Sequence, residues 1–574
     1  MSSIDIVLIG VYFIGVLSIG GYLSTKIKSS RDMFIAGRNS TWWIAGLSTY
    51  MTLFSAGTFV VWGGVAYRYG LVAVIIGMLL GLGSLVTGWM VSGKWRQLGI
   101  NSPAEYLGIR FGKSVINFYT LIGLIGRSVS TAVALYAISV MLVALIPLSE
   151  GHLLADPATG NLSVYYVIIL LGFFGVVYTI AGGFLAVLVT DLIQFAVLIA
   201  IIIFLIPLSL ESVGGVSNFV QNAPEGFFSL VSKEYTFSWL VLWCFLNFFM
   251  ISGDWPFVQR YISVPSVRDA KKAAYLVGAC YLITPIFWYI PAMVYRVLEP
   301  GANPEQAYVL ISQQVLPQGV LGIMIAAMIS ATMSMVDSTL NVFAGVFTYD
   351  IYQKNNGHCS EKRLILVGRI FTAVFGALVI VFALLIPVVG GAERVIVSFI
   401  TMVIGPLAIP AVWGLFSKHI GKKAVWYSMG ITYVTGFFVK GMVESGTMIH
   451  RWVEQSPITS YIQSNVAFVE ALVGLAIPVV ILTIMEIISR RRGIHLGWEE
   501  IKKAIAKEDS SVSITDTSFA RFAVKVLLWT FAGLGLFIGV LALFQDQQRD
   551  VMLYFSLAFL LGPGIVLFRS FYRK

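Results

Sequence analysis

MTLFSAGTFVVW, residues 51–62, decides the fold of this chain, because it breaks an apolar stretch that is otherwise long enough to cross a membrane. Glycine and serine lower helix stability, so the segment SAGT at 55–58 predicts an interruption near the middle of this helix. The segment GDWP at 253–256 interrupts a second apolar stretch, and proline disrupts a helix interior. Each break opens a set of five apolar stretches, at 42 to about 212 and at 237 to about 417.

The composition predicts an integral membrane protein. The 574 residues are 58% hydrophobic and only 11% charged, with a mean hydropathy of +0.87. Apolar runs of ~18 residues or more, enough to cross ~30 Å of hydrocarbon, recur along the whole length, and they must be helices because lipid satisfies no backbone groups. About fifteen candidate spans start near residues 4, 42, 71, 116, 162, 185, 237, 273, 312, 362, 391, 422, 464, 521 and 551.

Basic residues fall in alternate loops between these spans. The intervening loops are acidic or nearly neutral, whereas basic clusters follow odd-numbered spans, at 26–38, 94–113, 260–272, 354–363, 418–423, 490–492 and 569–574. Because basic loops stay in the cytoplasm, the pattern predicts the N-terminus outside and the C-terminus in the cytoplasm, in a cell membrane of the bacterial inner-membrane type. The net charge of +10 is spread over these loops rather than on one patch, so we expect no nucleic-acid partner.

The two interrupted stretches also organise the chain. The set at 42–212 starts inside and the set at 237–417 starts outside, as expected of an inverted repeat. In transporters built this way, the interrupted helices occupy corresponding positions and bind solute and ions near the midplane. The alternative is chance, since glycine and proline are common in membrane helices. Residues 1–41 then form an extra N-terminal helix and a cytoplasmic loop, and residues 418–574 form C-terminal helices with a cytoplasmic linker at about 490–517.

The segment ISATMSMVDSTLN, residues 329–341, carries a polar stripe inside a predicted span. Its spacing puts five polar side chains on one face of a helix, namely Ser330, Ser334, Asp337, Ser338 and Asn341. Hydroxyl and carboxylate oxygens suit a hard cation such as Na⁺, and a buried acid costs ~2.5–3.5 kcal/mol unless a partner offsets it. We therefore expect Asp337 to bind a cation or a proton. The alternative is a polar seam between packed helices.

Seven segments in this order resemble the solute:sodium symporter family, which includes the sodium/glucose cotransporters. They are GRNSTWWIAGLS (37–48), AGGFLAVLVTDLIQF (181–195), VQRYISVPSVRDAKK (258–272), AYVLISQQVLPQGVLGIMIAAMISATMSM (307–335), TYDIYQK (348–354), VGRI (367–370) and GPLAIPAVWGLFSK (405–418). The resemblance implies an all-α polytopic membrane protein of the leucine-transporter-type fold, with two inverted five-helix repeats, one extra N-terminal helix and about four extra C-terminal helices. It also implies secondary active transport with Na⁺ as the coupling ion.

The resemblance implies a main sodium site built from carbonyls of the first broken helix and oxygen ligands of the eighth core helix. The positions that match this site are Met51, Phe54, Ser55, Ala331 and Ser334. Family members usually carry a second hydroxyl after the one that matches Ser334, where this chain has Met335. A thioether is a poor ligand for a hard cation, so sodium coupling does not follow from the resemblance alone.

A second ion site, found in some family members, is completed by an acid on the fifth core helix. Asp191 matches that acid and is implied to face Ser334, Asp337 and Ser338 across the ion pathway. Asp337 stands where those members have a hydroxyl, so two carboxylates could hold Na⁺ more tightly or one could be protonated, which leaves a proton-coupled symporter as the alternative. Asp191 could instead cap helical backbone near the cytoplasmic end of its span.

The solute site of the sugar-transporting relatives is not reproduced in this chain. Their acidic and amide pair on the first broken helix is replaced by Gly57 and Thr58, and the Asn-Gln that precedes VQR in the sixth core helix is replaced by Asp254 and Trp255. Trp255 could stack on a sugar ring, gate the pocket or simply pack, and Asp254 could accept hydrogen bonds from hydroxyls or meet a cationic group. We expect a solute site that includes Thr58, these two residues and Gln259.

Arg127 is a further charge inside a predicted span, about eleven residues into the third core helix. An arginine at this depth is rare and usually has a partner. It could clamp a solute carboxylate in a bidentate pair, or it could be neutralised by Asp254 without touching the solute. The solute is therefore predicted to be a sugar, a sugar acid or another small carboxylate.

Other function classes fit the sequence less well. The five histidines lie in loops or near span ends, with no zinc-binding HExxH and no nucleophile-elbow pattern near a span, so we expect no enzyme activity, no catalytic residue, no cofactor and no metal other than sodium. Buried acids beside broken helices suit alternating access better than an open channel, and a solute sensor without transport is a further alternative. We predict a sodium-coupled symporter in a lipid bilayer, which could act as a monomer.

Overall fold

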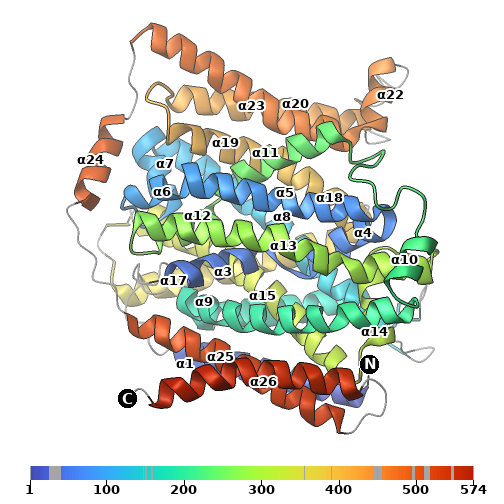
Figure 1. Cartoon of the computed structure of the whole chain (residues 1–574). Helices are drawn as coiled ribbons and strands as arrows, with labels where there is room; N and C mark the ends of the chain where they lie inside the picture. The colour runs from blue at the N-terminus through green and yellow to red at the C-terminus, as the bar shows by residue number, and fades with distance from the viewer. Residues whose placement is uncertain are drawn as a thin grey trace.

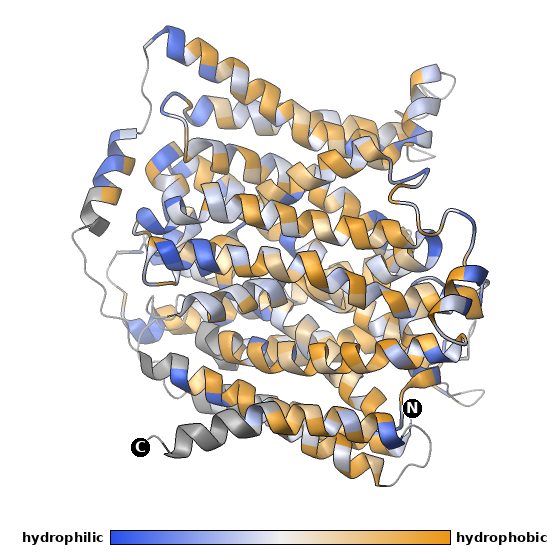
Figure 2. Ribbon diagram, viewed as in Figure 1, coloured by the Kyte–Doolittle hydropathy of each residue, from blue (hydrophilic) through white to orange (hydrophobic). Residues whose placement is uncertain are grey.

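The computed structural model describes the chain except at residues 1, 25–39, 147, 149–151, 157–159, 354–355, 358, 390, 444–448, 450–455, 494–497, 510–516, 544–548 and 573–574. Most of the described residues form long helices that lie roughly parallel or antiparallel (Figure 1). The middle parts of these helices are apolar, and polar residues gather at two opposite ends of the molecule (Figure 2), as expected for a bundle that crosses a bilayer.

The helices follow one another in three groups. The first group is α1 (Ser3–Ser24), α3 (Trp42–Leu53), η2 (Thr58–Trp62), α4 (Gly63–Tyr69), α5 (Leu71–Met90), α6 (Ser92–Gln97), α7 (Pro103–Phe111), α8 (Lys113–Leu145), α9 (Val164–Ser212) and α10 (Val216–Asn222). The second is α11 (Phe237–Gly253), α12 (Trp255–Ile262), α13 (Val267–Leu298), α14 (Ala307–Val315), α15 (Val320–Val346), η3 (Phe347–Gln353), α17 (Glu361–Val389), α18 (Ala392–Phe399), η4 (Ile400–Ile404) and α19 (Gly405–Gly414). The third is α20 (Lys422–Val443), α22 (Pro457–Ser464), α23 (Val466–Arg491), α24 (Trp498–Asp509), α25 (Thr517–Ala542) and α26 (Arg549–Tyr572).

The first helix break lies where the SAGT segment predicts it. The axes of α3 and of the helix that continues from Thr58 differ by 59°, and Phe54 between them has extended backbone angles, φ −101° and ψ 129°. Hydroxyls satisfy the amides that the break releases: Thr58 Oγ1 accepts from the amide of Ser55 (3.4 Å), and Thr332 Oγ1 accepts from the amide of Ala56 (3.1 Å). Because a buried amide without a partner is costly, these hydroxyls make the open backbone tolerable inside a membrane.

The second break separates α11 from α12. Asp254 leaves the helical region (φ −81°, ψ 135°), the two helix axes differ by 51°, and Pro256 stands in the first turn of α12, where its missing amide costs nothing. Both interruptions predicted from the sequence are therefore present.

By length and composition, nine helices of the described residues could cross a membrane, or eleven if each bent pair counts as one span. The two spans predicted near 162 and 185 share one helix, α9, which has 49 residues. Within α9, Leu188–Ser212 is long and apolar enough to cross a membrane, and Val164–Val177 is a shorter apolar segment.

Helix α15 lies at the centre of the bundle, and 94% of its most apolar window is buried. The N-terminal helix α1 is fastened to it by one carboxylate. Asp5 Oδ1 accepts hydrogen bonds from the amides of Gly319 (2.7 Å) and Gly322 (2.9 Å), at the N-terminal end of α15. A Cβ at Gly322 would lie 2.5 Å from the Asp5 backbone, so glycine is required for this approach. The carboxylate satisfies two amides that have no partner within the helix.

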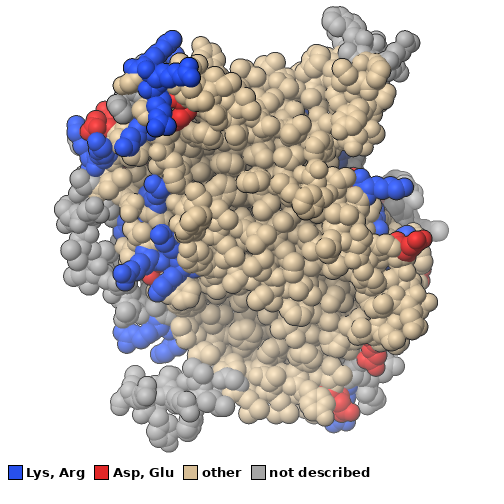
Figure 3. All heavy atoms as spheres, turned by 45° about the horizontal axis from the view of Figure 1, so that its top comes forward, with Lys and Arg blue, Asp and Glu red and all other residues tan. Residues whose placement is uncertain are grey.

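The end of the molecule that carries α6 and α7 is rich in Lys and Arg (Figure 3). Three arginines of the basic clusters are buried instead of exposed at the surface. Arg96, Arg110 and Arg260 are 6%, 3% and 0% exposed. Arg96 donates to the carbonyl of Val264 (2.6 Å) and Arg110 to that of Ser417 (2.9 Å), so these two side chains tie loops and helix ends together. The basic cluster at 26–38 lies outside the described residues.

The linker predicted at about 490–517 contains a helix. The amphipathic α24 packs against α6 and α7, and its Ile501 is buried. Lys418 Nζ lies 6.0 Å from the ring centroid of Trp498 in the same helix. Residues 494–497 and 510–516 of the linker lie outside the described residues.

Candidate functional site

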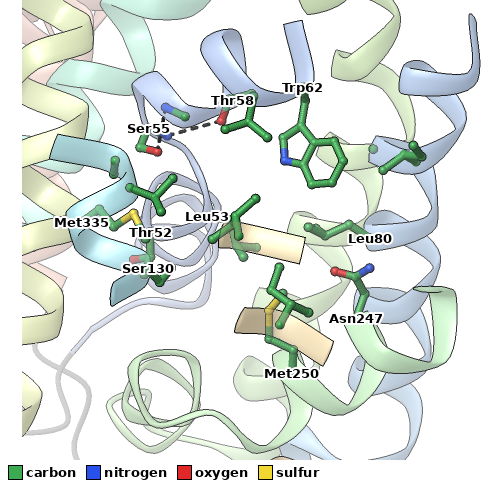
Figure 4. A pocket seen from close by; sticks show the side chains of 18 of the residues that line it. Thr52, Leu53, Ser55, Thr58, Trp62, Leu80, Ser130, Asn247, Met250 and Met335 are labelled. Carbon is green, nitrogen blue, oxygen red and sulfur yellow. Dashed lines mark hydrogen bonds between the residues drawn. The ribbon is translucent and has the colours of Figure 1, made fainter. Parts of the chain in front are cut away.

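A cavity of about 110 Å³ lies beside the first break and between α5, α8, α11 and α13. We call it the central cavity. Its polar lining consists mainly of neutral side chains, namely Thr52, Ser55 and Thr58 of the break, Ser130 of α8 and Asn247 of α11 (Figure 4). Asn247 donates through Nδ2 to the carbonyl of Trp243 (2.8 Å), and its buried Oδ1 has no hydrogen-bond partner in the described part of the chain. The cavity therefore offers an acceptor that a polar solute can satisfy.

Aromatic side chains form much of the remaining wall of the central cavity. Trp62 and Trp243 pack against each other with their ring centroids 5.6 Å apart, on the side shared by the first break and α11. Trp288, Tyr281 and Tyr289 of α13 also line the cavity. Flat aromatic faces with a few convergent polar atoms are typical of sites for small organic molecules.

Arg127 lines the central cavity from the middle of α8 and forms an ion pair with Asp254 at the second break. Both are buried, with side chains 5% and 9% exposed, and the guanidinium also lies 5.3 Å from the ring centroid of Phe257. Asp254 and Trp255 themselves line a second, smaller cavity of about 20 Å³, where Trp255 stacks on Phe343 with ring centroids 5.4 Å apart. Arg127 therefore belongs to one cavity and its partner to the other.

The residues predicted for the solute site are thus divided. Thr58 and Arg127 line the central cavity, whereas Asp254 and Trp255 line the second cavity. Gln259 is buried in α12 and belongs to the lining of neither. The sequence did not single out Ser130 or Asn247, because one hydroxyl or amide within an apolar helix carries no spacing signal.

The oxygen atoms predicted for the main ion site come from the first break and α15. The carbonyl of Met51 accepts from the amide of Phe54 (3.1 Å), and Ser55 Oγ accepts from the amide of Gly57 (3.2 Å). Ala331 and Ser334 are buried on the neighbouring α15. Met335 lines the central cavity, so its sulfur contributes to that wall. Carbonyl and hydroxyl oxygens fit a hard cation, and the set is short of one hydroxyl because of Met335.

Asp191 is the centre of a buried polar network next to these oxygens. Its carboxylate accepts from Ser334 Oγ and, through Oδ2, from Ser48 Oγ (2.5 Å). Arg260 Nη2 lies 3.8 Å from the same Oδ2, and the guanidinium donates to Ser48 Oγ and Ser338 Oγ, both at 2.9 Å. The structure therefore brings Asp191, Ser334 and Ser338 together, as predicted, and adds Ser48 and Arg260, which the sequence did not place there.

Asp337 is buried one turn beyond Ser334 and accepts a hydrogen bond from Thr179 Oγ1 of α9. In the described part of the chain Asp337 has no ion pair with Lys or Arg, in contrast to Asp191. An acid at this depth without a cation is costly, so Asp337 remains a candidate for a bound cation or proton. Thr179 gave no signal in the sequence, since its contact joins two distant helices.

A second group of charges lies at the opposite end of the bundle from α6 and α7. Arg68 of α4 forms an ion pair with Glu393 of α18, and Tyr235 donates to the same carboxylate (2.5 Å). The side chains of Arg68 and Glu393 are 36% and 21% exposed. The pair thus links α4 to α18, and α18 also contributes Ile396 and Phe399 to the wall of the central cavity.

Comparison with known proteins identifies the family. The model of the sodium:solute symporter family matches residues 33–431, more than half of the chain. The chain belongs to this family. Among its relatives, the sodium/myo-inositol cotransporter 2 of Oryctolagus cuniculus is 27% identical over 75% of this chain and 69% of its own, and the sodium/sialic acid symporter NanT of Aliivibrio fischeri is 26% identical over 64% of this chain and 74% of its own.

The solved structure of a Na⁺-coupled sialic acid symporter, in a substrate-bound outward-open state, has the same fold. It matches with a TM-score of 0.70 and 22% identity, over 85% of this chain and 98% of the other. The predicted leucine-transporter-type fold and the predicted family are therefore confirmed, and this sodium:solute symporter family member is a multi-pass membrane transporter rather than an enzyme.

Proposed function

We propose that this protein couples the entry of Na⁺ to the uptake of a small polar organic solute by alternating access. The observation that carries the proposal is the position of the central cavity, which is lined by both sides of the first break and lies next to the oxygen atoms around Ser334. An ion bound at a break in the helix can change the shape of a solute site that uses the same break. Binding of Na⁺ then favours one state only through its higher affinity for that state.

The main ion would be held by the carbonyls of Met51, Phe54 and Ala331 and by the hydroxyl of Ser334, with Ser55 beside them. These atoms are hard oxygens, which supports Na⁺ as the ion. Asp191, which accepts a hydrogen bond from Ser334, and Asp337, one turn further along α15, would supply the negative charge that draws the cation into the membrane. Ser338 would add a neutral hydroxyl oxygen. The two repeats, proposed as residues 42–212 and 237–417, would rock about this region to expose it to either side.

The relatives support the class of solute. Their names include cotransporters for sodium with glucose, myo-inositol and sialic acid, so a sugar, a sugar acid or another small carboxylate fits the family. The basic end of the molecule supports a cytoplasmic position for α6, α7 and the C-terminus, in a cell membrane. The N-terminus would then lie outside, and a monomer holds every residue named for the two sites.

Proton coupling is the second candidate, and two observations favour it. Met335 removes one oxygen from the sodium site, and Asp337 is a buried acid with no ion pair in the described part of the chain. A proton needs one acid, whereas Na⁺ needs several oxygens. The two candidates therefore predict different roles for Ser334.

Thermal unfolding of the purified protein in detergent separates these candidates. Each member of a panel of sugars, sugar acids, amino acids and carboxylates would be added in NaCl and in choline chloride. A solute that stabilises the protein only in NaCl supports sodium coupling, because a ligand of the folded state raises its stability. Ser334→Ala should weaken this sodium dependence. A solute effect that is equal in both salts but changes with pH would instead support proton coupling through Asp337.

A further inference from the structure

The central cavity holds a charge whose partner lies outside it. Among the described residues that line the cavity, Arg127 is the one cation, and the lining includes no Asp or Glu. Its guanidinium is paired with Asp254, which reaches it from the second break and lines the second cavity. The wall that faces a solute is therefore neutral overall, although it contains an arginine.

We propose that Asp254 determines the specificity of the cavity. Its carboxylate already pairs with the guanidinium of Arg127, in the place that the carboxylate of a solute would need. The cavity therefore accepts a neutral polyhydroxy solute and rejects solutes that carry a carboxylate. This inference rests on the proposed function and narrows the solute class that was left open there.

The cost of an anionic solute follows from the burial of the pair. A solute carboxylate placed on Arg127 must either share one guanidinium with Asp254 or displace it. In the first case two negative charges lie close together in a water-poor site. In the second case Asp254, which is 9% exposed, is left without its cation. Breaking a buried ion pair by removing one partner is strongly unfavourable, and a neutral solute avoids both costs.

A neutral polyhydroxy solute also matches the atoms that remain available. Arg127 Nε has no hydrogen-bond partner in the described part of the chain, and neither does Asn247 Oδ1. The first is a donor and the second an acceptor, and a hydroxyl group can serve both. The faces of Trp62 and Trp243 on the same wall suit the apolar face of a sugar or polyol ring.

The test uses pairs of solutes that differ in one carboxylate, galactose with galacturonate and glucose with glucuronate, together with amino acids and acetate. Their binding to the full-length protein in NaCl is measured from thermal unfolding as a function of solute concentration. We expect the neutral member of a pair to stabilise the parent protein at concentrations at least about tenfold lower than its acid. Asp254→Asn keeps the shape of the side chain but leaves the charge of Arg127 without its partner. In this variant the ratio of the stabilising concentration of the acid to that of the neutral solute should fall at least about tenfold, or the acid should become the better ligand.

Two further variants separate specificity from folding. Arg127→Gln combined with Asp254→Asn removes both charges, and it should keep the preference for the neutral member. Asp350→Asn removes the charge of a buried carboxylate that accepts from Ser102 Oγ (2.8 Å) and belongs to neither cavity, and it should leave the preference unchanged. If Asp254→Asn does not fold, a parent protein that prefers the acid would still overturn the inference.

Three results would overturn the inference: a parent protein that prefers the acid, a preference that Asp254→Asn leaves unchanged, or stabilisation by amino acids or acetate alone. None of them would contradict sodium coupling as long as the stabilisation requires Na⁺. A neutral sugar that stabilises equally in NaCl and in choline chloride would support the role of Asp254 and contradict the proposed coupling ion.

Discussion

Arg260→Gln tests the buried network around Asp191. Arg260 is fully buried, lies 3.8 Å from the carboxylate of Asp191, and donates to Ser48, Ser338 and the carbonyl of Pro256. Glutamine is shorter and carries no charge, so Asp191 would remain as a buried acid without a cation. Removing one partner of a buried ion pair costs about 3–5 kcal/mol, and we expect a loss of this size in the free energy of unfolding.

A double-mutant cycle provides the assay for this prediction. Arg260→Gln, Asp191→Asn and the combined variant would be unfolded in mixed micelles with increasing SDS, in buffer without Na⁺. The combined variant leaves no buried charge, so it should lose clearly less stability than the sum of the single variants, with a coupling energy of about 1.5–3 kcal/mol. Adding Na⁺ should rescue Arg260→Gln in part, because a cation can then neutralise Asp191. Losses that add within about 0.5 kcal/mol would refute the reasoning.

Three further predictions concern other parts of the molecule. Arg68→Gln breaks a half-exposed ion pair, so the free energy of unfolding should change by less than about 1 kcal/mol. In a protein that also carries Ser130→Cys, a membrane-impermeant thiol reagent should label Cys at position 130 faster with Arg68→Gln than without it. Reversing the pair with Arg68→Glu and Glu393→Arg should slow the labelling again, and an unchanged rate in Arg68→Gln would show that this ion pair does not limit access to the central cavity. Ser334→Ala should raise the Na⁺ concentration for half-maximal stabilisation about tenfold, and an unaltered Na⁺ titration would exclude its hydroxyl as a ligand. Asp5→Ala removes two hydrogen bonds from the start of α15 and should lower the free energy of unfolding, measured in SDS micelles, by about 2–4 kcal/mol. A loss below about 0.5 kcal/mol would show that this contact of α1 does not stabilise α15.

The sequence predicted the features that depend on neighbouring residues. Both helix breaks follow from local helix propensity, since glycine, serine and proline act within one turn of where they stand. The shared face of Ser334 and Ser338 follows from the 3.6-residue period of a helix. Asp191 was placed beside them by resemblance to the family, and the structure has it accept a hydrogen bond from Ser334.

Contacts between distant helices were not predictable in the same way. Arg260 follows an apolar stretch, so from the sequence it was interpreted as a charge in a cytoplasmic loop. The break at Asp254 places α12 within the bundle, and Arg260 therefore lies beside Ser48 and Ser338. The contact of Asp337 with Thr179 likewise depends on how α9 and α15 pack, which no pattern within either helix encodes.

Uptake into proteoliposomes tests the central claim most directly. Purified protein would be reconstituted, and the accumulation of radiolabelled galactose, glucose and myo-inositol would be followed under an inward Na⁺ gradient, an inward proton gradient in choline, and no gradient. The account predicts that at least one of these solutes accumulates above its external concentration with the Na⁺ gradient alone, and that a sodium ionophore abolishes the accumulation. Accumulation driven by the proton gradient in the absence of Na⁺, or equilibration that is the same under all three conditions, would contradict it.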